Sequence, residues 1–138
     1  MNQLTDYNND LILDISNELY ERVKVAINAG VKRWNIIIDP GIGFAKNFNQ
    51  NLEILKRLNE FNGKNSLLEG FPCLIGVSRK QFIGKVINQP IPQNRNWGTA
   101  AACTAAISAG VDILRVHDVK EMLDVAKVAD SIWRVNKK

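Results

Sequence analysis

The apolar positions near the start of the chain follow the period of a helix. They recur at steps of three and four residues, so they share one face of an amphipathic helix. The positions are Ile12, Ile15, Leu19, Val23, Ala26 and Ile27. Gly30 is expected to end this helix, because glycine adopts the left-handed cap conformation without strain.

Three largely apolar runs farther along the chain predict β-strands. They are WNIII (residues 34–38), CLIGV (73–77) and VDILRV (111–116). Continuous apolar runs of this kind are typical of strands buried on both faces of a parallel sheet. The first run ends abruptly at the turn Asp39-Pro40-Gly41.

Helical patterns lie between and after these runs. They cover residues 52–61, 82–87, 99–109 and 118–133. Two prolines mark residues 89–96 as a surface loop. Asn62 and Gly63 are expected to close the first of these helices, and Asp118 with Glu121 predicts a capping box at the start of the last. The last helix is expected to bury Met122, Ala126, Ala129 and Trp133.

The resulting order, α-β-α-β-α(α)-β-α, requires crossover connections, so the three strands should run parallel. Asp39, Ser78 and His117 each lie at a strand end and follow one another at intervals of 39 residues, which indicates a repeated βα unit. Repeated units build an open sheet or a closed barrel, and a closed barrel takes about 250 residues. The sequence therefore predicts either a small open sheet or part of a barrel. The glycines at 41 and 43 lack the further pattern of a dinucleotide-binding loop.

Composition places the chain among ordinary folded proteins, because 46% of its 138 residues are hydrophobic and 23% are charged. The net charge of +4 is scattered, so we expect no nucleic-acid partner and no membrane binding. No apolar stretch approaches the ~20 residues of a membrane helix, and the polar N-terminus is unlike a signal peptide. Cys73 and Cys103 lack metal-ligand spacing. They are expected to be reduced core thiols, which favours a cytoplasmic location.

Polar side chains follow each predicted strand, at the edge where parallel α/β proteins bind ligands. Arg115 and His117 alternate along one strand, so they should face one site together, beside the N-terminus of the last helix. A guanidinium and an imidazole in this position suit an anion such as a phosphate. The alternative is that Arg115 pairs with a carboxylate and His117 caps the helix.

The remaining candidate residues are each open to two interpretations. Asp39 could accept hydrogen bonds from an amine-rich ring, or it could simply start the Pro-Gly turn. Lys80 could contact a ligand or act as a Schiff-base nucleophile, or it could lie on the surface at a helix start. Phe44 could line a pocket or fold back on the core. The three tryptophans, Trp34, Trp97 and Trp133, are interpreted as packing residues.

Three motifs resemble dihydropteroate synthase, the folate-pathway enzyme, most closely in its eukaryotic, multifunctional form. They are IIIDPGIGFAKN (residues 36–47), GVSRKQFIG (76–84) and GTAAACTAAISAGVDILRVHDVKEM (98–122). They follow the order and spacing of that family. The family fold is a (β/α)8 TIM barrel. The resemblance therefore implies that residues 1–138 are a partial pterin-binding domain, the C-terminal part of an α/β barrel with about three parallel strands and flanking helices.

The resemblance also implies a role for each motif residue, in agreement with the anion site inferred above. The residues are Asp39 and Lys80 for the pterin, Phe44, Ser78 and Arg79 for p-aminobenzoate, and Arg115, Val116 and His117 for the diphosphate. The family condenses p-aminobenzoate with 6-hydroxymethyl-7,8-dihydropterin diphosphate, which gives dihydropteroate and diphosphate. Mg²⁺ is the implied cofactor, with its ligand in the N-terminal half of the family barrel. No residue of this chain is assigned as an acid, a base or a metal ligand.

The departure from the family pattern concerns length. The first five strands of the family barrel have no counterpart here, and three strands alone would leave two unpaired sheet edges. We therefore expect a fragment that needs the N-terminal half for activity. The complete enzyme would be a homodimer, and a longer chain could be mitochondrial. One alternative is a non-catalytic half-barrel that binds pterin or phosphate or acts as an interaction subunit. Another is a Schiff-base lyase that uses Lys80.

Overall fold

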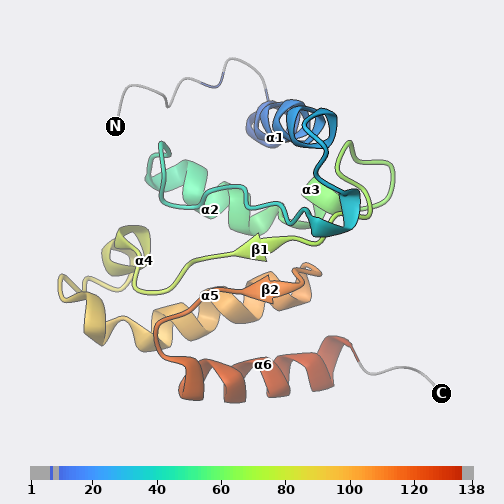
Figure 1. Cartoon of the computed structure of the whole chain (residues 1–138). Helices are drawn as coiled ribbons and strands as arrows, with labels where there is room; N and C mark the ends of the chain where they lie inside the picture. Colours follow the sequence, from blue (N-terminus) through green and yellow to red (C-terminus); the bar gives the residue numbers. More distant parts are fainter. Residues whose placement is uncertain (1–6, 8–9, 135–138) are drawn as a thin grey trace.

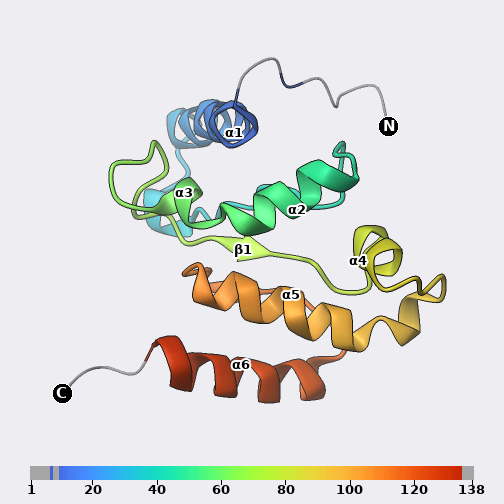
Figure 2. The ribbon, with the colours of Figure 1, turned by 180° about the vertical axis from the view of Figure 1, so that it is seen from behind.

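The computed structural model describes Tyr7 and residues 10–134, and in it a small parallel sheet lies between two groups of helices (Figure 1). Figures 1 and 2 show α1 to α3 on one side of the strands and α5 with α6 on the other. With η marking a 3₁₀ helix, the elements are α1 (Leu11–Asn28), η1 (Arg33–Asn35), α2 (Phe48–Lys56), α3 (Asn59–Asn62), β1 (Leu74–Ile75), α4 (Gln81–Val86), η2 (Pro92–Asn94), α5 (Asn96–Ser108), β2 (Ile113–Leu114) and α6 (Val119–Trp133).

The two strands pair in parallel, as the crossover argument predicted. Leu74 lies opposite Ile113 and Ile75 opposite Leu114, an offset of 39 residues. The backbone N–H of Arg115 continues the ladder by donating to the carbonyl of Ile75 at 2.9 Å. The offset matters for the site, because it also brings residue 78 level with residue 117.

The first predicted strand is wrong over most of its length. Residues 33–35 form the 3₁₀ turn η1, and only Ile38 joins the sheet, through a single parallel bridge to Cys73. Arg33 explains the turn, since its guanidinium donates to the carbonyl of Glu69 at 2.8 Å and stacks on the ring of Phe71 at 3.8 Å. The chain therefore reaches the sheet one residue before Asp39.

Helix α1 forms where the periodicity predicted it. The carboxylate of Asp10 caps it by accepting from the backbone N–H groups of Ile12 and Leu13 at 3.0 Å. The N-terminal part of the predicted face is buried, whereas Ile27 at its end is exposed. Gly30 follows with φ +95°, the left-handed conformation expected of it.

The second predicted helix is divided into α2 and α3. Asn47 caps α2 through a reciprocal pair with Gln50, so the helix begins four residues earlier than predicted. This shift changes the buried face to Asn51 and Ile54 and leaves Leu52 exposed. A polar side chain, Asn51, consequently lies beneath the glycine-containing turn.

The C-terminal helices form close to where the pattern predicts them, but the predictions for several single residues are wrong. The capping box at Asp118 is wrong: its carboxylate makes no cap bond to α6 and is bound by Arg79 instead. The prediction that the tryptophans pack in the core is also wrong, since Trp34, Trp97 and Trp133 are 79%, 87% and 49% exposed. Of the residues expected to be buried by α6, Met122 and Ala129 are buried and Ala126 is half-buried.

The cysteines are free and buried, as predicted. Burial raises the pKa of the Cys73 thiol to about 12, with the carboxylates of Asp112 and Asp39 adding to the effect. Burial also raises the pKa of Cys103 to about 11. Both side chains are therefore protonated thiols at neutral pH, and their role is packing.

Candidate functional site

The polar groups that follow the three sheet segments converge on one cavity of about 280 Å³. Arg115 Nη2 lies 3.8 Å from Asp39 Oδ2, and Lys80 lies close enough to both for their charges to influence it. The lining residues are Phe44, Gly76, Ser78, Lys80, Arg115, Val116 and His117. Every residue predicted for the site lines this cavity except Asp39 and Arg79. Asp39 borders the cavity through its contact with Arg115.

Asp39 is held by its own turn. Its Oδ1 accepts a hydrogen bond from the backbone N–H of Gly41 at 2.8 Å, as an Asp before Pro-Gly is expected to do. Its Oδ2 faces Arg115. The two interpretations of Asp39 are thus compatible, because one carboxylate oxygen starts the turn and the other remains on the side of the cavity.

Lys80 is fixed against the glycine-containing loop. Its ammonium donates to the carbonyl of Ile42 and lies 4.4 Å from the centroid of the Phe44 ring. Gly43 makes this approach available, since it has φ +80° and a Cβ there would lie 2.8 Å from Lys80 Cδ. Burial lowers the pKa of Lys80, Arg115 adds to that effect and Asp39 opposes it.

Arg115 packs against Gly76, which follows β1. A Cβ on Gly76 would approach Arg115 Nη2 to 2.8 Å, so a larger residue at this position would shift the guanidinium. The side chain of Arg115 is still 61% exposed. Since the contact to Asp39 is long, most of the donor capacity of Arg115 is available to a ligand.

His117 contacts the strand-end serine. Ser78 Oγ accepts the backbone N–H of His117 at 3.2 Å and lies 3.0 Å from the imidazole Nδ1. The His117 side chain therefore binds Ser78, which is against the alternative that it caps α6. The contact also uses Nδ1 and directs the opposite ring nitrogen away from Ser78.

Arg79, which was predicted to lie beside the p-aminobenzoate pocket, lines neither of the two cavities described here. Its Nε and Nη2 donate to Asp118 Oδ2 and Oδ1 at 3.0 Å and 2.5 Å, and it is not among the residues that line the cavity. The backbone of Arg79 has φ +61°. This conformation turns its side chain away from those of Ser78 and Lys80 on either side.

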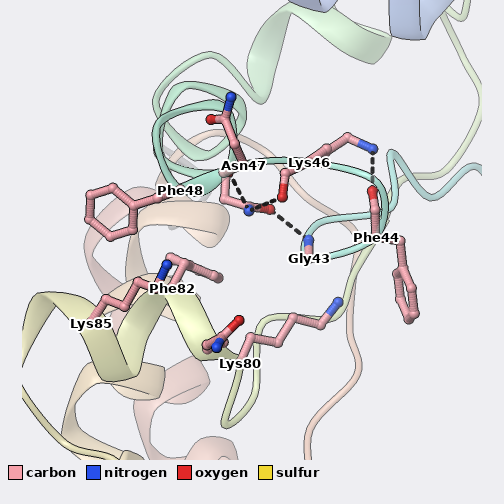
Figure 3. Close-up of a pocket in the computed structure, with 10 residues that line it drawn as sticks. Gly43, Phe44, Lys46, Asn47, Phe48, Lys80, Phe82 and Lys85 are labelled. Carbon is pink, nitrogen blue, oxygen red and sulfur yellow. Dashed lines mark hydrogen bonds between the residues drawn. The ribbon is translucent and has the colours of Figure 1, made fainter. Parts of the chain in front are cut away.

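A second, larger cavity of about 480 Å³ lies on the other side of Phe44 and Lys80 (Figure 3). Its charged lining residues are all lysines, and three phenylalanines contribute apolar walls. The lining residues are Gly43, Phe44, Lys46, Asn47, Phe48, Asn51, Lys80, Gln81, Phe82 and Lys85. Phe44 and Lys80 line both cavities and contact each other, so ligands in the two cavities would lie on either side of this pair.

Two residues that support the site were missed by the sequence analysis. Asn51 is buried, accepts the backbone N–H of Gly43 at 2.6 Å and donates to the carbonyl of Asn47 at 2.7 Å. Arg95 is 7% exposed and donates to the carbonyls of Gln89, Arg79 and Pro90 at 2.9, 2.7 and 2.6 Å. Arg95 lies at the end of the segment interpreted as a surface loop, where composition gives no sign of burial.

The described residues form no group of three or more His, Cys, Asp or Glu side chains that could hold a metal ion. Among the same residues, no helix is long and apolar enough to cross a membrane. At the cavity the chain presents the carboxylate of Asp39, the cations Lys80 and Arg115 and the imidazole of His117.

Comparison with known proteins agrees with this geometry. The family model described as pterin binding enzyme matches residues 1–117. Folic acid synthesis protein fol1 of Pneumocystis carinii is 48% identical over 134 residues, 97% of this chain and 18% of that protein. The dihydropteroate synthase of Synechocystis is also 48% identical over 134 residues, 97% of this chain and 44% of that enzyme.

A solved structure gives the same result in three dimensions. The crystal structure of dihydropteroate synthase from Clostridium difficile in the presence of pteroic acid has a TM-score of 0.87 and 43% identity to this chain. The match covers 96% of this chain and 48% of the Clostridium difficile chain.

A cavity at the carboxyl ends of parallel strands is typical of α/β ligand-binding proteins. The chain belongs to the pterin binding enzyme family. Its fold is that of part of the α/β barrel formed by dihydropteroate synthases. The chain spans less than half the length of the curated relatives described above.

Proposed function

We propose that this chain supplies the pterin-, p-aminobenzoate- and diphosphate-binding groups of a dihydropteroate synthase, a transferase of folate biosynthesis. The observation that carries the proposal is the convergence of Asp39, Lys80 and Arg115 from three successive sheet segments on one cavity. A carboxylate beside two cations suits a substrate that has an amine-rich ring at one end and a diphosphate at the other.

Each group has a role in this proposal. The free oxygen of Asp39 accepts from the amino and ring N–H groups of the pterin, and Lys80 donates to its ring oxygen. Arg115 and His117 hold the diphosphate, with the peptide of Val116 between them and the N-terminus of α6 beginning two residues beyond His117. p-Aminobenzoate enters from the larger cavity and lies against Phe44 and Lys80, with its amine toward the smaller cavity lined by Ser78.

The proposed reaction depends on leaving-group stabilisation. As the bond from the pterin methylene to the diphosphate oxygen breaks, negative charge grows on that oxygen, and Arg115 and His117 offset it. The aniline nitrogen of p-aminobenzoate forms the new bond to the methylene and loses one proton to solvent. Holding the two substrates in neighbouring cavities supplies the orientation of the attack. No side chain of this chain is required as a general base.

Mg²⁺ remains a prediction. The described residues do not fit it by themselves, because Asp39 is the one carboxylate beside the cavity and its oxygens already face Gly41 and Arg115. Mg²⁺ prefers several oxygen ligands with near-octahedral geometry. The residues of this chain therefore account for binding and orientation, and no step above passes through a metal.

The assembly and the location are also proposed. We expect the complete enzyme to be a homodimer, since an apolar groove of about 410 Å³ between α5 and α6 includes the exposed side chains of Val128 and Ile132. Sedimentation of the complete enzyme at monomer mass would reject the dimer. A cytoplasmic location remains the prediction, although one relative is a mitochondrial folate synthesis bifunctional protein of Arabidopsis thaliana.

The test combines this chain with the part of the Synechocystis enzyme that it does not cover, and the product is called the reconstituted barrel below. We expect dihydropteroate to form from p-aminobenzoate and the pterin diphosphate, and none to form with either part alone. Binding of the pterin diphosphate without turnover would favour the non-catalytic half-barrel. Covalent trapping of a carbonyl substrate on Lys80 by borohydride would favour the lyase.

A further inference from the structure

Two consecutive pairs of side chains connect the loops that follow β1 and β2. Ser78 contacts His117, and Arg79 forms its two hydrogen bonds with Asp118. Each pair has the 39-residue offset of the strands themselves. The side chains therefore continue the register of the sheet beyond the point where backbone pairing ends.

The backbone of Arg79 is anchored as firmly as its side chain. Its N–H donates to Thr99 Oγ1 at 3.1 Å, and its carbonyl accepts from Arg95 Nη1 at 2.7 Å. Thr99 and Arg95 are both buried. Arg79 is thus fixed at its N–H, its carbonyl and its guanidinium, which makes it a rigid support for the loop between Ser78 and Lys80.

The ion pair also affects the charge beside the cavity. The guanidinium of Arg79 lowers the pKa of Asp118, so this carboxylate is ionised at neutral pH. Asp118 directly follows His117, which lines the cavity, although Asp118 itself does not line it. Without Arg79, the negative charge of Asp118 would be unpaired one residue from the expected anion site and would disfavour an anion there.

We propose that Arg79 and Asp118 are positioning residues of this site. Their ion pair holds the two loops in register, keeps Nδ1 of His117 against Ser78, and directs Nε2 toward the bound anion. The nature of that anion, a diphosphate, rests on the proposed function. The orientation of the imidazole does not depend on the proposed function, so the positioning role and the proposed function can be rejected separately.

The sequence offers a direct reporter, because His117 is the single histidine of the chain. We would label histidine with ¹⁵N in this chain only and record the imidazole nitrogens in the reconstituted barrel, at a pH where the ring is neutral. The variants are Arg79→Gln, Asp118→Asn and the conservative Arg79→Lys. Inorganic diphosphate is the probe of anion binding.

A matched control is available in the pair between Arg57 and Glu60. This pair is also bidentate, at 2.8 and 2.7 Å, and the side chains of Arg57 and Arg79 are each 25% exposed. Arg57 lines neither cavity described above. Arg57 also pairs with Asp10 and Glu53, so Arg57→Gln removes a bidentate pair and two further ion pairs without altering either of the two loops.

We expect one dominant imidazole tautomer in the unchanged chain and in Arg57→Gln. Arg79→Gln and Asp118→Asn should give a mixture, and Arg79→Lys should recover part of the dominant form. Arg79→Gln should also weaken diphosphate binding by roughly fivefold or more, as for loss of a partly exposed charge contact. If Arg79→Gln fails to assemble, as judged by circular dichroism, Asp118→Asn and Arg79→Lys supply the comparison.

Two outcomes separate this inference from the proposed function. Unchanged tautomers and unchanged diphosphate affinity in both Arg79→Gln and Asp118→Asn would overturn the positioning role, whether or not the barrel turns over. A tautomer change in a barrel that binds diphosphate but forms no dihydropteroate would support the positioning role and reject the reaction.

Discussion

Replacing Gly43 by alanine should separate backbone strain from the position of Lys80. Gly43 has φ +80°, and an added Cβ would lie 2.8 Å from Lys80 Cδ. Gly41, two residues earlier, has φ +71°, but its added Cβ would meet only Lys46 Nζ, at 3.5 Å. The two substitutions therefore share the strain of a left-handed alanine and differ in whether they displace a site lysine.

The size of the difference follows from the contacts of Lys80. A left-handed alanine costs about 1–2 kcal/mol at either position. Displacing Lys80 also removes its hydrogen bond to the carbonyl of Ile42, about 1.5 kcal/mol for a charged donor, and about 0.5 kcal/mol of cation–π contact with Phe44. Gly43→Ala should therefore destabilise the protein by about 2 kcal/mol more than Gly41→Ala.

The assay is urea unfolding of the reconstituted barrel, followed by circular dichroism, together with the Kd for the pterin diphosphate. Gly43→Ala should lower both stability and affinity, whereas Gly41→Ala should lower stability with a smaller effect on affinity, through the turn that holds Asp39. Equal unfolding free energies and equal affinities for the two variants would refute the reasoning, because Lys80 would then not depend on the shape of this loop.

Four further results are expected of the reconstituted barrel. Arg115→Ala should raise the Kd for the pterin diphosphate about tenfold, or ~1–2 kcal/mol for a half-exposed charge contact, and equal Kd values for Arg115→Ala and the exposed Arg22→Ala would contradict this. Arg95→Met should lower the unfolding free energy by about 2–4 kcal/mol in thermal denaturation, because three carbonyls lose their hydrogen-bond donor. A loss of less than about 0.5 kcal/mol, as for a surface substitution, would contradict this prediction. Cys73 should resist iodoacetamide at pH 8 until the protein unfolds, because burial raises its pKa to about 12, and fast labelling of the native protein would show that the thiol is accessible. The ion pair with Arg79 lowers the pKa of Asp118, so it should stabilise the fold at pH values above the ordinary carboxyl pKa and lose this effect as the carboxylate is protonated. Asp118→Asn should therefore reduce the pH dependence of the unfolding free energy in urea between pH 5 and 3.

Much of the architecture could be predicted because one physical rule sufficed for each element. The helical period located α1, and the crossover rule made β1 and β2 parallel. The strand predicted at residues 34–38 was wrong although its apolar residues suit a buried strand. Arg33 binds Glu69 and Phe71, and this contact bends the chain before it reaches the sheet. Such a contact joins residues far apart in the sequence and leaves no local pattern.

The site itself was predictable where residues line up with the strand register. The spacing of 39 residues between Ser78 and His117 indicated a repeated βα unit, and in the structure these two side chains are in contact. The same offset applied one residue later would have paired Arg79 with Asp118 and excluded the capping box. Asp39 does not follow this register, because the bridge from Ile38 to Cys73 places it nearer the start of β1.

The buried position of Arg95 limits which sequences this region can use. Its guanidinium donates to the peptide carbonyls of three different residues, and none of these three partners is a carboxylate. A lysine ammonium is a compact donor that cannot reproduce the planar fork. A saturation library at this codon, screened for the stability of the reconstituted barrel, should therefore return arginine almost alone, even though the neighbouring residues 91–94 are exposed and should accept many replacements.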